Sequence, residues 1–211
     1  MSGNLAYEDW AKEDIVDEGD ESSGHIDGYP DELIDGYLVR KIRPFTNHAI
    51  VSGNIGCIFH QLMKCTTLEP IKNFGVHLTD KDVFIPDVAV AHDMSQIEEF
   101  SIRGAPDLVV EILAPATVKL IRGYKMRVYE SCGVPEYWIV NHYDRSVEVY
   151  LLKDGRYELD NVYTLYSQHI LDIMEDAEKA TVIPEFKCHM CDDVVIRLEE
   201  IFEGMFDFKD G

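Results

Sequence analysis

The sequence predicts an α/β fold with a mixed central β-sheet flanked by α-helices and extended by added antiparallel strands. Residues 107–113 (DLVVEIL) are largely apolar on both alternating faces, which is typical of a central strand covered on each side. Residues 48–64 and 119–132 carry apolar positions at helical spacing. Residues 136–141 and 146–152 alternate around a short turn and indicate an antiparallel hairpin. Strands and helices in this order favour a mixed sheet.

The beginning of the chain divides into an acidic segment and the start of the folded part. Residues 1–30 are polar and acidic, so we expect a partly flexible segment with a weak helix near 7–17. A single domain is expected over 31–211. ELIDGYLVRKI at 32–42 indicates a turn and a strand.

The later elements follow in regular succession. Thr46 or Asn47 can cap the helix over 48–64. Its apolar stripe consists of Ile50, Val51, Ile55, Ile58, Phe59 and Leu62. The remaining predicted elements are strands at 74–78, 83–91 and 107–113, a helix at 119–132 that stops at Gly133, the hairpin, a short strand after the turn at 153–155, and a helix over 194–202.

The net charge of −21 argues against a simple nucleic-acid binder, because phosphate contacts need Lys and Arg. The charge is concentrated at the ends, where residues 1–35 carry −11 and residues 192–211 carry −5. The simplest interpretation is that these acidic ends keep the protein soluble. By contrast, residues 101–128 carry a local net charge of +3. The most basic neighbourhood therefore surrounds the aliphatic strand.

Several classes of protein are disfavoured by the pattern of apolar residues and cysteines. The sequence has no apolar run of about 18 residues or more, so no membrane span is expected. The N-terminus lacks the pattern of a signal peptide, and five cysteines without framework spacing suit reduced thiols, so we expect a cytoplasmic protein. Cys188 and Cys191 resemble half of a zinc site, but no second pair of ligands completes it.

Glu111 is the unusual residue of the aliphatic strand, because an unpaired buried carboxylate is costly. It shares its face with Asp107, which is four residues away and therefore about 13 Å distant. The two carboxylates cannot bind one metal ion, and Asp107 is expected at the strand entrance. A partner for Glu111 should come from a neighbouring strand.

Asp87 in IPDVAVA is the expected partner, since it also stands in an apolar run. Pro86 cannot donate to a strand ladder and indicates a bulge or bend. Because adjacent strands lie about 4.8 Å apart, carboxylates on them can approach one another. Hard oxygen ligands of this kind suit Mg²⁺ or Mn²⁺.

Lys125 falls on the apolar stripe of the helix at 119–132, with Ile121, Val128 and Tyr129 at helical spacing from it. A lysine that snorkels from the edge of the stripe is the alternative. A buried glutamate on the preceding strand favours the inward orientation, because it needs a cation. Asp87, Glu111 and Lys125 together suit phosphodiester hydrolysis assisted by a metal ion.

The motifs IPDVAVA, GAPDLVVEIL, RGYK and CGVPEYWIVN, in this order, resemble the Uma-type family of restriction endonucleases, a branch of the PD-(D/E)xK nuclease superfamily. The resemblance runs from residue 32 to the C-terminal helix. It implies a restriction-endonuclease-like core with Asp87 and Glu111 as metal ligands. The superfamily lysine would stand at Leu113, and the family relocates it to Lys125.

The resemblance also implies two further site residues. A family glutamate near the N-terminus matches Glu32, whose alternative role is to anchor the first strand. A family histidine before the first helix matches His48, for which a role in starting the helix is the alternative.

The chain departs from the family pattern at four positions. Ala114 and Ala116 replace two hydroxyl residues, while Ile121 and Asn141 replace two aspartates. These changes would weaken phosphate or metal contacts, although the central trio is intact.

The leading hypothesis is a Mg²⁺- or Mn²⁺-dependent DNA endonuclease, expected as a homodimer because cutting both strands of a duplex takes two sites. One alternative is a catalytically weak or inactive nuclease fold that acts as an interaction module, which the acidic ends and the two alanines favour. A hydrolase of another phosphate-containing substrate is the third hypothesis, since the trio favours phosphate without specifying DNA.

Overall fold

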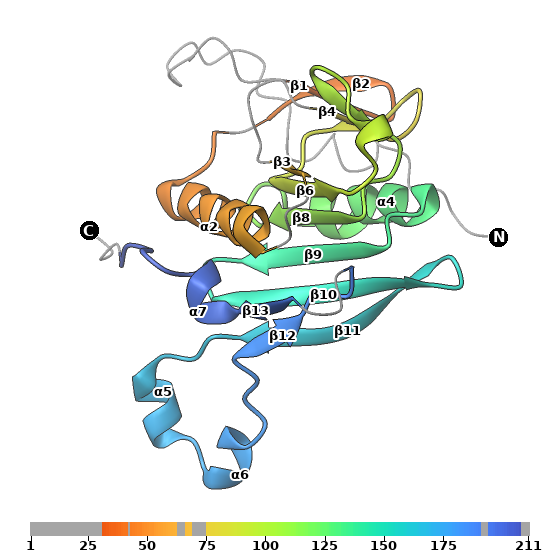
Figure 1. The fold of residues 1–211 in the computed structure, drawn as a ribbon. Helices are drawn as coiled ribbons and strands as arrows, with labels where there is room; N and C mark the ends of the chain where they lie inside the picture. Colours follow the sequence, from red (N-terminus) through yellow and green to blue (C-terminus); the bar gives the residue numbers. More distant parts are fainter. Residues whose placement is uncertain (1–30, 42, 63–65, 69–74, 191–193, 208–211) are drawn as a thin grey trace, which may run out of the picture.

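The computed structural model describes residues 31–41, 43–62, 66–68, 75–190 and 194–207. The expected flexible segment at 1–30 and its helix near 7–17 lie outside these residues. A six-stranded sheet in the order β11-β10-β9-β8-β6-β3 forms the centre of the fold (Figure 1). Its strands are β3 (Thr66–Leu68), β6 (Val88–Ala91), β8 (Leu108–Ile112), β9 (Glu136–Asn141), β10 (Ser146–Lys153) and β11 (Arg156–Thr164). Only β8 and β9 are parallel among these pairs, which confirms the predicted mixed sheet.

A second sheet in the order β2-β1-β5-β4-β7 lies above the central one in Figure 1. Its strands are β1 (Asp31–Ile34), β2 (Tyr37–Arg40), β4 (Gly75–His77), β5 (Val83–Phe84) and β7 (Ser101–Arg103). A small hairpin of β12 (Glu185–Lys187) and β13 (Val195–Arg197) completes the strands that the structure describes.

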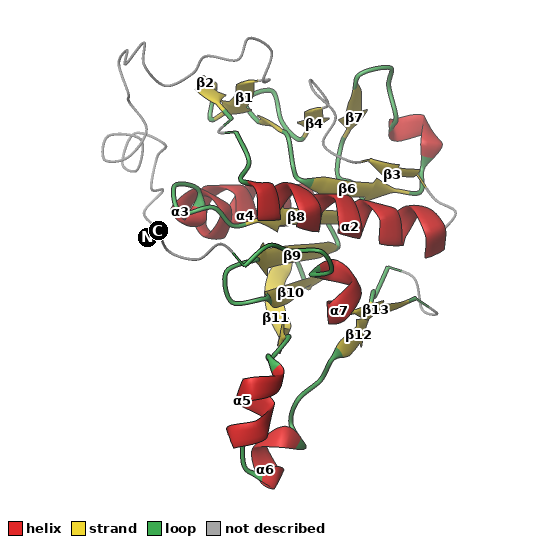
Figure 2. Cartoon of the chain, turned by 90° about the vertical axis from the view of Figure 1, so that its left-hand side faces the viewer, coloured by secondary structure: helices red, strands yellow, loops and turns green. Residues whose placement is uncertain are grey.

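Helices cover both faces of the central sheet. The helices of the described residues are α2 (Thr46–Leu62), α3 (Val118–Leu120), the π-helix η2 (Ile121–Lys125), α4 (Met126–Cys132), α5 (Gln168–Ile173), α6 (Asp176–Lys179) and α7 (Leu198–Ile201), with a 3-10 turn η1 at Met94–Gln96. On one face of the sheet lies α2, and on the other lie η2 and α4. Figure 2 shows α2 lying across the strands, whereas α5 and α6 project away from the sheet. Among the described residues, no helix is long and apolar enough to span a bilayer.

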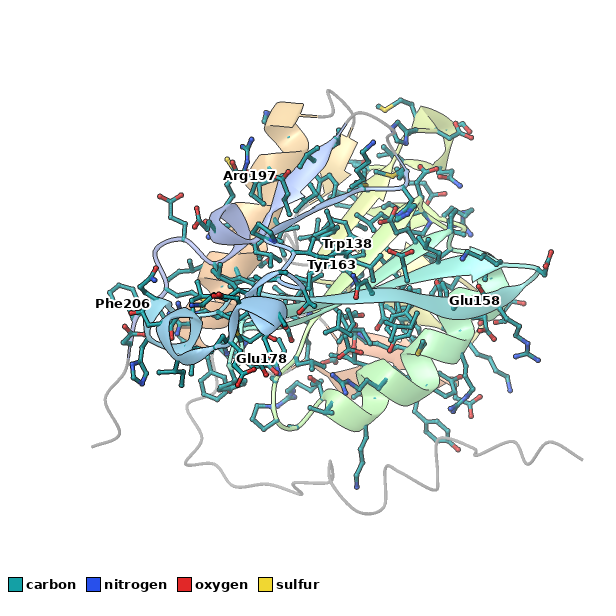
Figure 3. The ribbon with its side chains drawn as sticks, turned by 90° about the horizontal axis from the view of Figure 1, so that it is seen from below. Trp138, Glu158, Tyr163, Glu178, Arg197 and Phe206 are labelled. Carbon is teal, nitrogen blue, oxygen red and sulfur yellow. The ribbon has the colours of Figure 1, made fainter. Side chains whose placement is uncertain are left out.

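The alternation of β8 assigns its side chains to two separate cores. Leu108, Val110 and Ile112 pack with α2, together with Trp138 of β9. Val109 and Leu113 instead pack with η2 and α4, together with Tyr137 and Ile139 of β9. Seen from below, α2 and α4 lie on opposite sides of the sheet, with Trp138 on the side of α2 (Figure 3). The two-sided burial predicted for residues 107–113 is confirmed, and Glu111 belongs to the face of α4.

The strand predicted over 83–91 is two strands in the structure. Residues 83–84 belong to the second sheet and residues 88–91 to the central sheet. Pro86 stands at the break, where the missing N–H removes a ladder bond. The chain therefore passes from one sheet to the other immediately before Asp87.

Two further expectations are corrected at the ends of elements. The sequence predicts one helix over residues 194–202, but β13 precedes α7, because strand pairing sets Ile196 opposite Phe186 in the buried core. The helix α2 begins at Thr46, so Asn47 lies inside its first turn. The Asn47 side chain exchanges hydrogen bonds of 2.9 and 2.9 Å with the main chain of Phe206. The predicted stop at Gly133 is confirmed by its left-handed conformation, with φ at 86°.

Glu136 is a buried carboxylate that ties β9 to the C-terminal part of the chain. It accepts hydrogen bonds from the indole N–H of Trp138 at 2.8 Å and from the main-chain N–H of Met190 at 3.0 Å. The Sγ atom of Cys188 lies 3.7 Å from the same carboxylate. Burial raises the pKa of Glu136, while these donors favour its ionised form.

Replacing Glu136 by Ala is expected to lower the free energy of unfolding by about 2–4 kcal/mol, because two N–H donors lose their acceptor. Urea denaturation at pH 7 measures this difference. Glu158→Ala is the matched control, since Glu158 is 60% exposed on β11 and its loss should change stability little. Equal losses in the two variants would contradict the anchoring role of Glu136.

Candidate active site

Glu111 lies in the middle of the fold, and its side chain is only 3% exposed. Its Oε1 atom accepts hydrogen bonds from Lys125 Nζ at 2.9 Å and from the Tyr129 hydroxyl at 2.8 Å. Among the described residues, no hydrogen-bond donor contacts its Oε2 atom. Glu111 therefore keeps one carboxylate oxygen available for a further ligand.

Lys125 reaches Glu111 from the last position of the π-helix η2. The wider π turn is a local irregularity of a kind often found at functional sites. Lys125 Nζ lies 2.7 Å from Glu32 Oε1 and 5.2 Å from the centroid of the Phe84 ring. The side chain is 3% exposed, so the inward orientation predicted for Lys125 is confirmed and the snorkelling alternative is wrong.

Glu32 brings the second sheet into the same cluster. It lies on β1, where Oε1 accepts hydrogen bonds from Lys125 and from the main-chain N–H of Ile85 at 2.6 Å. This contact shows that Glu32 anchors β1 and also contacts Lys125. Glu32 thus links β1, the segment after β5 and the π-helix.

Asp87 stands beside Glu111 across the β6–β8 pair. The main-chain N–H of Asp87 donates to the Val110 carbonyl at 3.1 Å, directly before Val88 pairs with Val110 in the antiparallel register. Asp87 Oδ2 accepts the main-chain N–H of Ile112 at 2.7 Å, which fixes the carboxylate against β8. Glu111 therefore lies on β8, whereas Asp87 lies in the segment directly before β6 and not on a strand as the sequence predicts.

Two cationic or ionisable groups surround Asp87. Lys41 Nζ lies 3.2 Å from Oδ1 and also donates to the main-chain carbonyl of Ile85. His48, near the start of α2, places Nε2 3.3 Å from Oδ2. His48 therefore contacts the site, as the resemblance implies, in addition to being part of the first helical turn.

Burial and neighbouring charges shift the pKa values of Glu111 and Asp87 in opposite directions. Burial raises the pKa of Glu111, and Lys125 offsets only part of this effect because Asp87 and Glu32 repel the charge. Burial also opposes ionisation of Asp87, yet Lys41 and His48 outweigh it and hold its pKa well below the usual range. Burial raises the pKa of Tyr129 well above its usual value, so its hydroxyl remains a donor.

The same balance keeps Lys125 charged. Burial disfavours its ammonium group, but the attraction of Glu111 and Glu32 is stronger and raises the pKa of Lys125. The ring of a second histidine, His142, lies 6.1 Å from that of His48. Unlike the pKa of Lys125, the pKa of His142 is lowered, because burial disfavours its charged form. The Nδ1 atoms of both histidines are buried without a hydrogen-bond partner in the described part of the chain.

The cluster fits a hard divalent cation in its donor chemistry and its charge. Three carboxylates, from Glu32, Asp87 and Glu111, face the two lysines Lys41 and Lys125, which leaves one excess negative charge while His48 is neutral. Carboxylate oxygens are the preferred ligands of Mg²⁺ and Mn²⁺. Among the described side chains, no three His, Cys, Asp or Glu residues form a group that could hold a metal ion. A cation would therefore rely on Asp87, Glu111 and non-side-chain ligands.

The remaining sequence candidates lie outside this cluster. Asp107 precedes β8 and accepts the main-chain N–H of His92 at 2.7 Å, in agreement with a role at the strand entrance. Asn141 hydrogen-bonds to Asp144 at 2.8 Å within its own hairpin turn. Cys188 is buried beside Glu136, and Cys191 lies outside the described residues.

The structure shows the surroundings of Ile121 and Ala114, two of the positions that depart from the family pattern. Ile121 is buried in the core beneath η2, where an aspartate would lack solvent. The turn at Ala114 is closed by Thr117, whose hydroxyl lies 3.2 Å from both the N and the O atom of Ala114. One threonine therefore supplies the hydroxyl contacts of this turn.

Sequence reasoning missed Lys41 and the hydrogen bond of Tyr129. Its spacing from Lys125 predicts that Tyr129 lies on the apolar stripe, and the same spacing brings its hydroxyl within 2.8 Å of Glu111. Lys41 follows the basic residue Arg40 at the end of the segment YLVR (37–40). Nothing in this local pattern distinguishes Lys41 from a solvent-exposed lysine.

Comparison with known proteins identifies one matching family and a similar solved structure. Residues 28–181 match the Uma2 family, which is described as "Putative restriction endonuclease". A crystal structure of a putative nuclease belonging to DUF820 from Anabaena variabilis ATCC 29413 is similar at 16% sequence identity, with a TM-score of 0.60 over 82% of this chain and 89% of that chain. This likeness confirms the predicted restriction-endonuclease-like α/β fold. No match was found among the curated proteins.

Replacing Lys125 by Met is expected to lower the free energy of unfolding by about 3–5 kcal/mol, because Glu32 and Glu111 would remain buried without their shared cation. Urea denaturation of the metal-free protein measures the loss. Adding Glu111→Gln to Lys125→Met should recover about 1 kcal/mol or more, since the variants share one network.

Lys153→Met is the matched control for this prediction, because Lys153 forms an exposed ion pair with Glu158 at 3.2 Å. It should change stability little. If the Glu111 and Lys125 variants were additive, the ion pair would not be energetically coupled as the geometry indicates.

Proposed function

The chain belongs to the Uma2 family of putative restriction endonucleases, and on that basis we propose that it is a divalent-metal-dependent endonuclease that hydrolyses phosphodiester bonds in DNA. The observation that carries the proposal is the buried cluster in which Lys125 joins Glu32 and Glu111 beside Asp87. A charged group of this size inside a core is costly to maintain for stability alone. The cluster combines carboxylates that can bind a metal ion with a lysine that can stabilise negative charge, as hydrolysis of a phosphodiester requires.

Each side chain has a distinct role in this proposal. Asp87 and Glu111 are the metal ligands, since Asp87 accepts the N–H of Ile112, the residue after Glu111, and Glu111 Oε2 has no donor among the described residues. Lys125 is the electrostatic catalyst, because an ammonium has three N–H donors and two of them contact Glu32 and Glu111. In this proposal its third N–H donates to a water molecule or to a phosphate oxygen. Glu32 positions Lys125.

Mg²⁺ or Mn²⁺ bound at Asp87 and Glu111 would supply charge neutralisation for the phosphate and a lowered pKa for the attacking water. The chain's own contribution is orientation. Ile112 N–H and His48 fix Asp87, while Tyr129 and Lys125 fix Glu111. Such fixed ligands reduce the reorganisation needed at the moment of reaction.

The proposed substrate is DNA, with a homodimer that presents two sites to the two strands of a duplex. Membership of the family supports a nucleic-acid substrate. The local basic segment over 101–128 contributes less than its charge suggests, because Arg103 pairs with Glu98, Arg122 pairs with Glu148, and Lys125 is buried.

This internal pairing favours a second candidate function, a catalytically weak nuclease fold that acts as an interaction module. A protein with few available phosphate contacts would bind DNA weakly. The two candidates differ in their response to metal, because only the nuclease needs a cation at Asp87 and Glu111.

We expect Mn²⁺ to raise the melting temperature of the wild-type protein and to support plasmid nicking, because binding to the folded state stabilises it. Glu111→Ala should abolish the metal-dependent rise and reduce nicking by about 100-fold or more, since even indirect metal-site contacts are worth about 10–100-fold. Melting curves and nicking assays on the same samples measure both effects.

Glu185→Ala is the control, because its side chain is 53% exposed on β12 and distant from the cluster in sequence and strand order. It should respond to Mn²⁺ as the wild type does. A wild-type protein that neither binds Mn²⁺ nor cleaves DNA, in the folded state, would favour the interaction module instead.

A further inference from the structure

Lys41 occupies a position that the proposed catalytic role does not explain. Its Nζ atom lies 3.2 Å from Asp87 Oδ1 and donates to the main-chain carbonyl of Ile85. The other Asp87 oxygen is engaged by the N–H of Ile112 at 2.7 Å and by His48. The ammonium group of Lys41 is therefore the cation bound to the oxygen of Asp87 that points away from the main chain of β8.

The charge of Lys41 acts on both proposed metal ligands. It is the strongest of the attractions that lower the pKa of Asp87, and it also favours the ionised form of Glu111. A divalent cation that binds Asp87 and Glu111 would stand next to this ammonium and be repelled by it. Both cations need the same carboxylate charge.

Lys41 is held less firmly than Lys125. Lys125 contacts two carboxylates and is 3% exposed, whereas Lys41 contacts one carboxylate and one carbonyl and is 19% exposed. Lys41 also follows the end of β2 at Arg40, outside any helix or strand. A lysine with a long flexible stem at the edge of the cluster can turn toward solvent at little cost.

We infer that Lys41 is a tethered cation that occupies the Asp87 side of the metal site in the metal-free protein and is displaced when a divalent cation binds. This inference rests on the proposed metal site and adds a residue that sets its affinity. In the absence of metal, Lys41 compensates the buried charge of Asp87. In its presence, Lys41 is a competitor, so it raises the metal concentration at which the site fills.

Calorimetric titration of Mn²⁺ into wild-type protein and Lys41→Met tests the inference without reference to activity. The variant should bind Mn²⁺ about tenfold more tightly or better, because one adjacent positive charge is removed. Without metal its melting temperature should be lower than that of the wild type, since Asp87 loses its partner. Saturating Mn²⁺ should narrow or reverse that difference.

Three variants make the outcome specific. Lys41→Gln keeps a hydrogen-bond donor and removes the charge, so it should show the same gain even if Lys41→Met does not fold. Lys41→Arg keeps the charge and should bind Mn²⁺ nearly as the wild type does. Lys81→Met removes the same charge from a side chain that is 71% exposed and should leave the affinity unchanged.

The outcomes separate this inference from the proposed function. Equal Mn²⁺ affinity in the wild type, Lys41→Met and Lys41→Gln would overturn the role of Lys41 and leave the metal site standing. An equal gain in Lys81→Met would also overturn it, because the effect would then reflect net charge. Absence of Mn²⁺ binding in all variants would overturn both.

Discussion

The buried contact of Lys125 with Glu32 and Glu111 is the interaction on which the arrangement of the site depends. One ammonium group joins β1 of the second sheet, β8 of the central sheet and the π-helix η2. Neither carboxylate could be buried there as an unpaired anion. The relative position of the two sheets at this point is therefore coupled to the charge state of a single lysine, and the core around Phe84 and Tyr129 packs against that contact.

Asp87 adds a further carboxylate to this ion-pair cluster. Its place directly after the break at Pro86 sets it beside β8, where its carboxylate accepts the N–H of Ile112 and contacts His48 of α2. With His48 neutral, the cluster contains three carboxylates and two ammonium groups, with Lys41 on the Asp87 side and Lys125 on the Glu111 side. A core that is only stabilised by ion pairs would be expected to balance its charges, whereas a site for a divalent cation requires an excess of carboxylate.

Periodicity predicted the parts of the fold in which strand alternation or helical spacing alone determines which side chains are buried. The alternation of residues 107–113 assigned Glu111 to one face, and helical spacing brought Lys125 to the same face. The second sheet was not predicted, because strands as short as Val83–Phe84 are too short to show alternation. The helix expected at 194–202 was partly wrong, because pairing of Ile196 with Phe186 decided the local structure. Lys41 was missed because only the tertiary fold brings the end of β2 to Asp87.

The central claim is that Asp87 and Glu111 together bind a divalent cation in the core of the fold. Its most direct test is a crystal structure of the wild-type protein grown with Mn²⁺, in which anomalous scattering locates the ion. We predict a peak within about 2.0–2.5 Å of one carboxylate oxygen from each residue. Diffraction that shows ordered Asp87 and Glu111 side chains but no anomalous peak between them, at saturating Mn²⁺, would contradict the claim.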